Sequence, residues 1–273
     1  MPFEVGRVKL PVDTRAPTGS TNCYVLGEHD ALLVDPAVDH PDLHAIVDAG
    51  DVAHVAVTHT HPDHVGDVAG AAEATGATVW CRRGREDAFE RATGVAPDRT
   101  FAEGDAIETG DGPVTILDLP GHAPDHVGFA VQEALAPGAV DPSEVVVCGD
   151  LAVAEGSVTV GAPEGDMRAY LTSLRRLRAR DPDVLLPGHG PEIRDPRETL
   201  DRLVDHRRER ERKVLVAAES GARTPDEIVD AAYEKDLAGV RDLARATVVA
   251  HVEKLAREGR LRWDATVGHV EVV

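Results

Sequence analysis

The sequence predicts a layered α/β domain followed by a small domain of helices and a hairpin, and three observations lead to this. Short Val-, Ile- and Leu-rich runs alternate with Ala-, Arg- and Glu-rich stretches through residue 201, bounded by Gly, Pro and Asp. From Pro196 onward the pattern changes to helices. The charge changes as well, because residues 1–201 hold 15 basic and 35 acidic side chains and residues 202–273 hold 14 of each. We expect one domain over residues 1–198 and a second over residues 199–273.

The elements of the first domain follow from apolar runs that are short and flanked by turn residues. Two helices are expected, at residues 67–75 and 167–178, the second with its apolar residues on one face. The predicted strands are residues 23–26, 31–34, 52–58, 78–81, 114–119, 127–131, 145–148, 157–160 and 184–186.

The second domain has the element order of a winged helix. A long helix is predicted over residues 198–220, and a second begins at Thr224, an N-cap followed by Pro at the first helical position and Glu at the third. A third helix is expected over residues 240–258. Residues 260–263 and 267–272 then read as the strands of a terminal hairpin.

The charge composition indicates the salt concentration in which the chain is stable. It has 49 acidic and 29 basic side chains, a net charge of −20, and only four of the basic residues are lysines. Repulsion of this size destabilises a folded chain in dilute salt and is screened in molar salt, where the Debye length is about 3 Å. The composition resembles that of proteins from salt-accumulating halophiles, so we expect a halophilic protein.

Nothing in the sequence suggests export or a membrane. No apolar stretch approaches the roughly 20 residues that a bilayer span needs, and residues 1–6 lack the features of a secretory signal. Cys23, Cys81 and Cys148 are odd in number and widely spaced, so we expect reduced thiols rather than a disulfide framework or a cysteine zinc site. The expectation is a soluble cytoplasmic protein with no membrane partner.

Four segments share one design, in which an apolar strand ends and a metal-ligand type of residue follows beside Gly or Pro. Strand ends of a rigid sheet are where loops bring distant side chains together. The first segment is the strongest signal, because it has four candidate ligands within six residues, in the pattern His-x-His-x-Asp-His. The candidate ligands of the four segments are His59, His61, Asp63 and His64, then His122, Asp150 and His189.

The spacing within the first segment suggests two ions. His59 and His61 lie two residues apart, so on extended backbone both imidazoles face the same side and can bind one ion at about 2.0–2.1 Å. Asp63 and His64 begin the following helix and point to a second ion. His and Asp ligands suit two Zn²⁺ ions, with Mn²⁺ or Fe as alternatives.

The other three segments complete both sites. His122 would finish a three-His site, and His189 would finish the second site with Asp63 and His64. Asp150, with one oxygen toward each ion, would bridge them.

These motifs resemble the metallo-β-lactamase-fold hydrolases in order and approximate spacing across residues 20–190. The resemblance implies a four-layer αββα sandwich with a dinuclear site at one edge. Finer features resemble the branch of β-lactamase-like protein 2, an endoribonuclease-type group: the Gly-His-Ala-Pro-Asp-His run at residues 121–126, the Gly-Ala-Pro-Glu-Gly-Asp-Met run at residues 161–167, and the winged-helix-like tail. One departure is Gly66-Asp67 where family members often carry Gly-Gly. Asp67 is expected either to accept a hydrogen bond from a ligand His or to cap a helix.

The expected mechanism follows from the metals. Two ions about 3.5–4 Å apart would hold a bridging water, lower its pKa toward 7 and present hydroxide to a carbonyl carbon or to phosphorus. Asp63, at the edge of the site, is the candidate catalytic residue that moves a proton. His126, four residues after His122, is a candidate substrate contact.

Three functions remain open for this sequence. The first is hydrolysis of an ester-type or phosphodiester bond, with single-stranded RNA as the candidate partner, since the basic run at residues 206–213 would hold backbone phosphate. Two observations argue against RNA. The chain is strongly anionic, and contacts to phosphate weaken in molar salt. The second is a thioester hydrolase resembling hydroxyacylglutathione hydrolase. The third is a non-catalytic nucleic-acid-binding regulator, which an intact set of seven ligands argues against.

Overall fold

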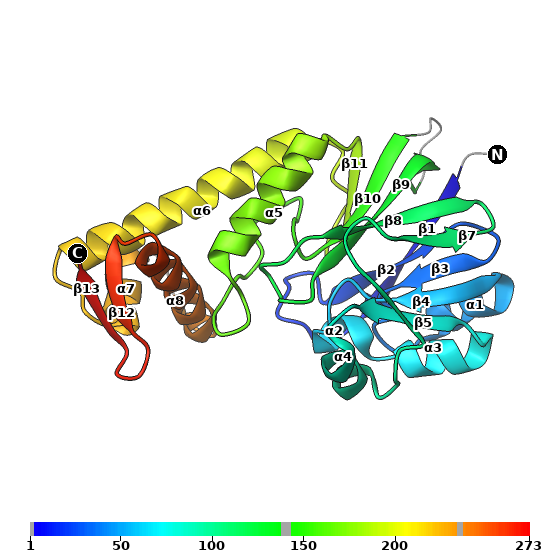
Figure 1. Ribbon diagram of the computed structural model, residues 1–273, viewed down its shortest axis with the longest axis horizontal. Helices are drawn as coiled ribbons and strands as arrows, with labels where there is room; N and C mark the ends of the chain where they lie inside the picture. Colours follow the sequence, from blue (N-terminus) through cyan, green and yellow to red (C-terminus); the bar gives the residue numbers. More distant parts are fainter. Residues whose placement is uncertain (1–2, 138–142, 234–236) are drawn as a thin grey trace.

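A computed structural model describes residues 3–137, 143–233 and 237–273 of the chain (Figure 1). The strands are β1 (Phe3–Pro11), β2 (Ser20–Leu26), β3 (Ala31–Val34), β4 (Val52–Ala56), β5 (Thr78–Arg82), β6 (Arg99–Phe101), β7 (Ala106–Thr109), β8 (Gly112–Asp118), β9 (Val127–Leu135), β10 (Ser143–Gly149), β11 (Val184–Pro187), β12 (Leu261–Asp264) and β13 (His269–Val272). The helices are α1 (Pro41–Ala49), α2 (Pro62–Val65), α3 (Val68–Thr75), α4 (Glu86–Thr93), α5 (Met167–Arg180), α6 (Pro196–Glu219), α7 (Pro225–Ala232) and α8 (Arg241–Arg257).

Strands β1 to β11 form one hydrogen-bonded network that folds into two halves. One half runs in the order β1-β2-β3-β4-β5-β6, and the other consists of β7 to β11 in sequence order. The halves join where the start of β1 pairs with the end of β9, Phe3 opposite Ala134. The parallel pairing of β3, β4 and β5 places the carboxyl ends of these strands at the same edge.

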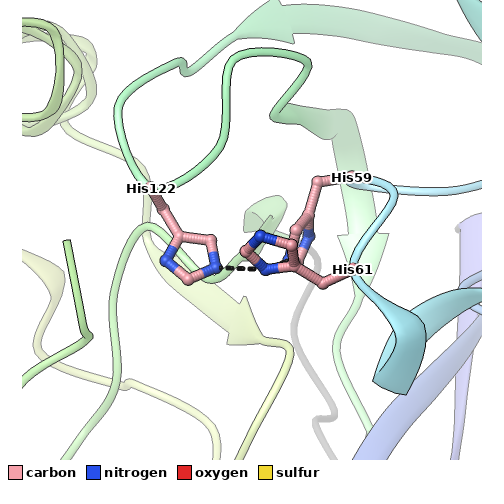
Figure 2. Close-up of side chains that lie close together, drawn as sticks. All are labelled: His59, His61 and His122. Atoms are coloured by element: carbon pink, nitrogen blue, oxygen red, sulfur yellow. Dashed lines mark hydrogen bonds between the residues drawn. The ribbon is translucent and has the colours of Figure 1, made fainter. Parts of the chain in front are cut away.

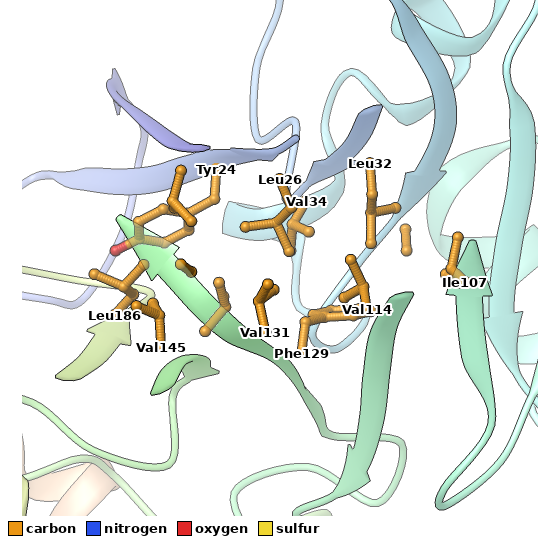
Figure 3. Packing of buried hydrophobic residues seen from close by; sticks show 14 of the residues in the cluster. Tyr24, Leu26, Leu32, Val34, Ile107, Val114, Phe129, Val131, Val145 and Leu186 are labelled. Atoms are coloured by element: carbon orange, nitrogen blue, oxygen red, sulfur yellow. The ribbon is translucent and has the colours of Figure 1, made fainter. Parts of the chain in front are cut away.

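The two halves pack face to face, and helices cover both outer faces. The central core contains Tyr24 and Val34 from one half and Val114 and Phe129 from the other (Figure 3). A second core lies between the first half and helices α1, α3 and α4, and a third between the second half and helices α5 and α6. Helix, sheet, sheet and helix follow in layers, which confirms the αββα sandwich.

The last part of the chain has a core of its own. Helix α6 runs unbroken from the sandwich toward α7, α8 and the β12–β13 hairpin (Figure 1). Leu200 and Leu203 on α6 pack in the sandwich, whereas Val214 and Ala217 on the same helix pack with α7, α8 and the hairpin. The expected boundary after residue 198 falls in the first turn of α6, before this change of core. The division into two domains and the winged-helix class stay predictions.

One predicted strand is wrong. Residues 157–160 form a loop rather than a strand. Its carbonyl groups bond to side chains instead of a neighbouring strand: Val158 O accepts a hydrogen bond from Arg207, and Thr159 O accepts one from His122. The apolar run therefore packs without joining the sheet.

Five elements were not predicted, namely β1, α1, α4, β6 and β7. Strand β1 does alternate buried and exposed residues over its first four positions, the period of a half-buried strand. Helix α4 has few apolar residues and buries only Phe89. Helix α4 and strands β6 and β7 are short and mostly polar, and their periodicity is too weak to be read from the sequence.

Two expectations about the environment can be compared with the structure. None of the helices in the described ranges is long and apolar enough to cross a membrane. Cys23, Cys81 and Cys148 are free and buried, as predicted.

Candidate metal centre

The candidate ligands all lie at one edge of the sandwich, just beyond strand ends. His59 and His61 follow β4, and Asp63 and His64 lie in the one-turn helix α2. Pro62, at the first position of α2, suits the start of a helix because it needs no backbone donor there. The remaining three follow β8, β10 and β11 respectively, and they are His122, Asp150 and His189.

Three imidazoles form the first group (Figure 2). The Nδ1 atom of His61 lies 2.9 Å from Nε2 of His59 and 2.9 Å from Nε2 of His122. The outer nitrogen of His61, Nε2, lies 3.2 Å from Glu164 Oε2, which accepts its hydrogen bond. Three ring nitrogens from two segments thus converge on one point, although His61 and His122 are 61 residues apart in the sequence.

The second group consists of Asp63, His64 and His189. Asp63 Oδ2 lies 3.5 Å from Nε2 of His189. The same oxygen accepts a hydrogen bond from the Thr14 hydroxyl, which lies in the β1–β2 loop. A carboxylate and two imidazoles here complement the three imidazoles of the first group.

Asp150 lies between the two groups. Its Oδ2 is 3.5 Å from Nε2 of His122 and 3.5 Å from Nε2 of His189, while its Oδ1 is 3.7 Å from Nε2 of His64. Burial by itself raises the pKa of Asp150, but the hydrogen bond from His189 and the charges of the three imidazoles hold that pKa well below its usual range. The group is therefore an anion between six candidate ligands.

Hydrogen bonds on the outer side of the site orient two of the ligands. His122 Nδ1 lies 2.7 Å from Thr159 O, and His189 Nδ1 lies 2.8 Å from Ser20 O. A backbone carbonyl can only accept, so each Nδ1 carries the proton and donates it. Nε2 of each ring then faces the centre and, once it has lost its proton, presents the lone pair that a metal ligand requires.

Asp35 orients two more ligands, and the sequence analysis missed it. Its Oδ2 accepts hydrogen bonds from His64 Nδ1 at 2.9 Å and from the Thr58 hydroxyl at 2.8 Å. Because that hydroxyl gives its proton to Asp35, it accepts from His59 Nδ1 at 3.0 Å. Burial lowers the pKa of His64, yet the charge and hydrogen bond of Asp35, together with the charges of Asp150 and Asp63, raise that pKa to about 9. The carboxylates thus favour positive charge at this position.

Asp67 does not accept a hydrogen bond from a ligand histidine, which was one of the two roles considered for it. Asp67 lies at the N-cap of α3, makes no capping hydrogen bond with its side chain, and the acceptor for His64 is Asp35 instead. The sequence did contain a signal for the role of Asp35. This acid directly follows β3, just as the candidate ligands follow their strands.

Asp125 is a second residue that the sequence analysis passed over. Its Oδ2 accepts hydrogen bonds from the backbone N–H of Thr60 at 3.0 Å and from the Thr60 hydroxyl at 2.7 Å. Thr60 separates His59 from His61, so Asp125 holds the loop that presents both imidazoles.

His126 is completely buried beneath the site. Its Nε2 accepts the backbone N–H of Asp150 at 2.9 Å. Burial, with a further contribution from His122, lowers the pKa of His126 to about 3, so the ring is neutral and able to accept. This environment favours a role in positioning Asp150 over the predicted contact with substrate.

The residues present fit a metal site. Nε2 of His64 and Oδ1 of Asp150 are buried and have no hydrogen-bond partner. Buried polar atoms are normally paired, so two such atoms facing each other at 3.7 Å suit coordination of a cation. The donors are nitrogen and oxygen, which suit zinc and several other divalent metals.

Comparison with known proteins defines the class. The model of the Metallo-beta-lactamase superfamily matches residues 16–189, and the chain belongs to this family. A metallo-β-lactamase family protein from Thermus thermophilus, whose structure is solved, shares the fold with a TM-score of 0.76 at 23% identity, over 98% of each chain.

Two relatives are similar over most of the chain. A β-lactamase-like protein 2 homolog from Drosophila melanogaster is 27% identical over 262 residues, covering 89% of this chain and 84% of the relative. An atrochrysone carboxyl ACP thioesterase from Aspergillus fumigatus is 25% identical over 276 residues, covering 90% of this chain and 82% of the relative. The chain is a hydrolase of the metallo-β-lactamase superfamily with a His and Asp cluster able to bind metal.

Proposed function

We propose that this chain is a dinuclear zinc hydrolase that cleaves ester-type bonds, thioesters included. The observation that carries the proposal is the position of Asp150, whose carboxylate lies 3.5 Å from an imidazole of the first group and 3.5 Å from one of the second. A single carboxylate shared by two three-ligand groups suits a pair of neighbouring ions.

The ligand sets follow from the two groups. His59, His61 and His122 would hold one ion, and Asp63, His64 and His189 the other, with Asp150 shared. Ions at these positions would supply a nucleophile derived from water at neutral pH and stabilise negative charge on the attacked group. Nitrogen and oxygen donors favour Zn²⁺, and they also accept Mn²⁺ or Fe.

Asp63 is the residue we assign to proton transfer. Its Oδ2 faces His189 at 3.5 Å, and its side chain is only partly buried, so it lies at the solvent side of the cluster. The Thr14 hydroxyl donates to the same oxygen and holds the carboxylate in place. A carboxylate held in this way can accept a proton from water during attack and release it to the leaving group.

The contacts that the basic residues of α6 already make favour an ester over RNA as the substrate. Arg207 is buried, and its guanidinium lies over the ring of Tyr170. Arg210 lies over the ring of Tyr233 in the same way, 3.9 Å from its centroid. These cations already have partners, which reduces what the helix offers to backbone phosphate.

The exposed part of the run is paired as well. Arg208 forms an ion pair with Asp205, and Arg212 forms one with Glu209. With a net charge of −20 on the whole chain, these pairs support a substrate that is not a polyanion. Cleavage of single-stranded RNA and non-catalytic binding of nucleic acid are therefore the alternatives that the experiment must exclude.

The test combines metal analysis with a substrate panel. Purified protein is expected to contain two zinc ions per chain by mass spectrometry of the metal content. In high salt the loaded protein is offered p-nitrophenyl acetate, S-lactoylglutathione, single-stranded RNA and a chromogenic lactam, and we expect turnover of the ester and the thioester. The His61→Ala variant is expected to lose metal and activity together.

Other results would reject the proposal. RNA cleavage without ester turnover would establish the phosphodiester alternative. Nucleic-acid binding with no turnover of any substrate would establish the regulator, and full activity of metal-free His61→Ala would reject the ligand assignment.

A further inference from the structure

A groove of about 580 Å³ opens beside the second ligand group. It lies between the β1–β2 loop, the loop that follows β3, and the start of α2. Asp63 forms part of its wall, so a molecule in the groove lies next to the proposed second ion. The residues that line it are Pro11, Val12, Asp13, Gly19, Ala37, Val38, Pro62 and Asp63.

The lining of this groove is mostly apolar. Five of its residues are Pro, Val or Ala, contributed by all three segments. Ala37 is buried and Val38 half-buried, and both contact the core beneath the groove. Such a surface stabilises an apolar group by removing it from water, and a volume of this size is in the range of small-molecule sites, which is about 300–1,000 Å³.

The charges of the groove disfavour an acyl chain that ends in an anionic group. Its only charged residues are Asp13 and Asp63, and none of the described residues that line it is basic. The arginine of the β1–β2 loop, Arg15, donates to both carboxylate oxygens of Asp242 and to Gly239 O. Asp63 is a proposed ligand of the second ion, so Asp13 is the carboxylate that would repel an acid group at the end of an acyl chain, and it leaves an uncharged group unaffected.

We propose that this groove binds the acyl chain of the substrate, and that the chain is uncharged and apolar. The inference rests on the proposed function, because the groove can hold part of the substrate only if Asp63, which lines it, belongs to the active site. The apolar walls favour the hydrocarbon chain, and the Asp13 carboxylate selects against acyl groups that end in an acid. The scissile carbonyl then lies at the Asp63 end of the groove.

The test is a chain-length series measured on the zinc-loaded full chain in high salt. The substrates are p-nitrophenyl esters of acetic, butyric, hexanoic and octanoic acid, together with the monoester of adipic acid as the anionic match to the hexanoyl ester. We expect kcat/KM to rise about fourfold for each methylene until the groove is full, the effect of removing one methylene from water. The adipoyl ester is expected to be slower than the hexanoyl ester by tenfold or more, roughly the discrimination expected for a charge facing a carboxylate.

The variant Val38→Asp places a third carboxylate in the groove. It is expected to lower the ratio of octanoyl to acetyl kcat/KM by about tenfold, the loss of roughly two buried methylenes. A ratio of two substrates does not depend on how much of the protein is folded or loaded with metal. The control is the same substitution at Val216, which is 45% exposed on α6 and outside the groove, and which should leave the ratio unchanged.

Two results would overturn the inference while leaving the proposed function intact. One is ester turnover with no dependence on acyl length, and the other is an equal decrease in the ratio for both variants. Failure of the protein to hydrolyse any ester would reject the proposed function, and the groove assignment with it.

Discussion

At the scale of single residues, the candidate metal centre depends on groups that lie behind the ligands and orient them. Asp35 is the clearest case, because it accepts hydrogen bonds from His64 and Thr58 and through Thr58 orients His59. Its backbone has a φ of 57°, in the left-handed region that Asn and Asp tolerate better than most residues. A small acidic residue therefore satisfies both the chain path and the ligands at this position.

Replacing Asp35 with Asn removes its charge and keeps its shape and left-handed tolerance. We expect the affinity for the ion held by His64 to decrease by about 10–100-fold, the usual effect of losing a carboxylate behind a ligand imidazole. Competition with a chromogenic chelator measures this. Asp67→Asn is the matched control, since Asp67 makes no contact with His64, and an equal loss in both variants would contradict the assignment.

At the scale of elements, helix α6 supports the metal centre from a distance. Arg207 on α6 is buried and donates to Val158 O, one residue before Thr159, whose carbonyl accepts from His122. A helix that packs on the sandwich therefore holds the 157–160 loop, and that loop holds a candidate ligand.

The Arg207→Met variant keeps the length of the side chain but loses the donor. Leaving a buried carbonyl without its partner costs about 1–3 kcal/mol, so urea unfolding should show a loss of this size. The visible spectrum of the Co²⁺-loaded protein should change as well, because His122 is less well held. Arg208→Met, one residue away and exposed, should change stability by less than about 0.5 kcal/mol and leave the spectrum unaltered.

At the scale of the whole molecule, helix α8 connects the last part of the chain to the loops around the site. Arg15 in the β1–β2 loop pairs with Asp242, and Arg257 pairs with Asp166, which caps α5. Ala162 N also donates to Ala246 O. The predicted second domain thus braces the loops that carry Thr14 and Glu164, both of which bond to candidate ligands.

The net charge of −20 makes the stability of the folded chain dependent on salt. Because repulsion among the acidic residues is screened as ionic strength rises, we expect the Tm to increase by about 10 °C between dilute and molar salt, which is roughly 3 kcal/mol for a chain of this size. Thermal unfolding followed by circular dichroism in NaCl and in KCl checks this. A Tm that stays constant or decreases would contradict the halophilic prediction.

The sequence by itself determined the kind of site and the layered fold. The spacing of His59, His61, Asp63 and His64 is a local property of six residues, and strands that end beside Gly or Pro are recognisable without knowledge of their partners. Strand β3 and helix α5 also lie where they were expected, because a local sequence pattern defines each of them. Helix α5 extends two residues further than predicted.

Only the tertiary structure decided how these residues are held. The partner of His64 is 29 residues away in sequence and the partner of Arg207 is 49 residues away, and no local pattern encodes either contact. The 157–160 segment has the composition of a strand, but its carbonyls accept hydrogen bonds from Arg207 and His122. The packing of α6 on the sandwich brings Arg207 to this segment. The groove beside Asp63 arises in the same way, because three segments define its volume and charge only after the chain has folded.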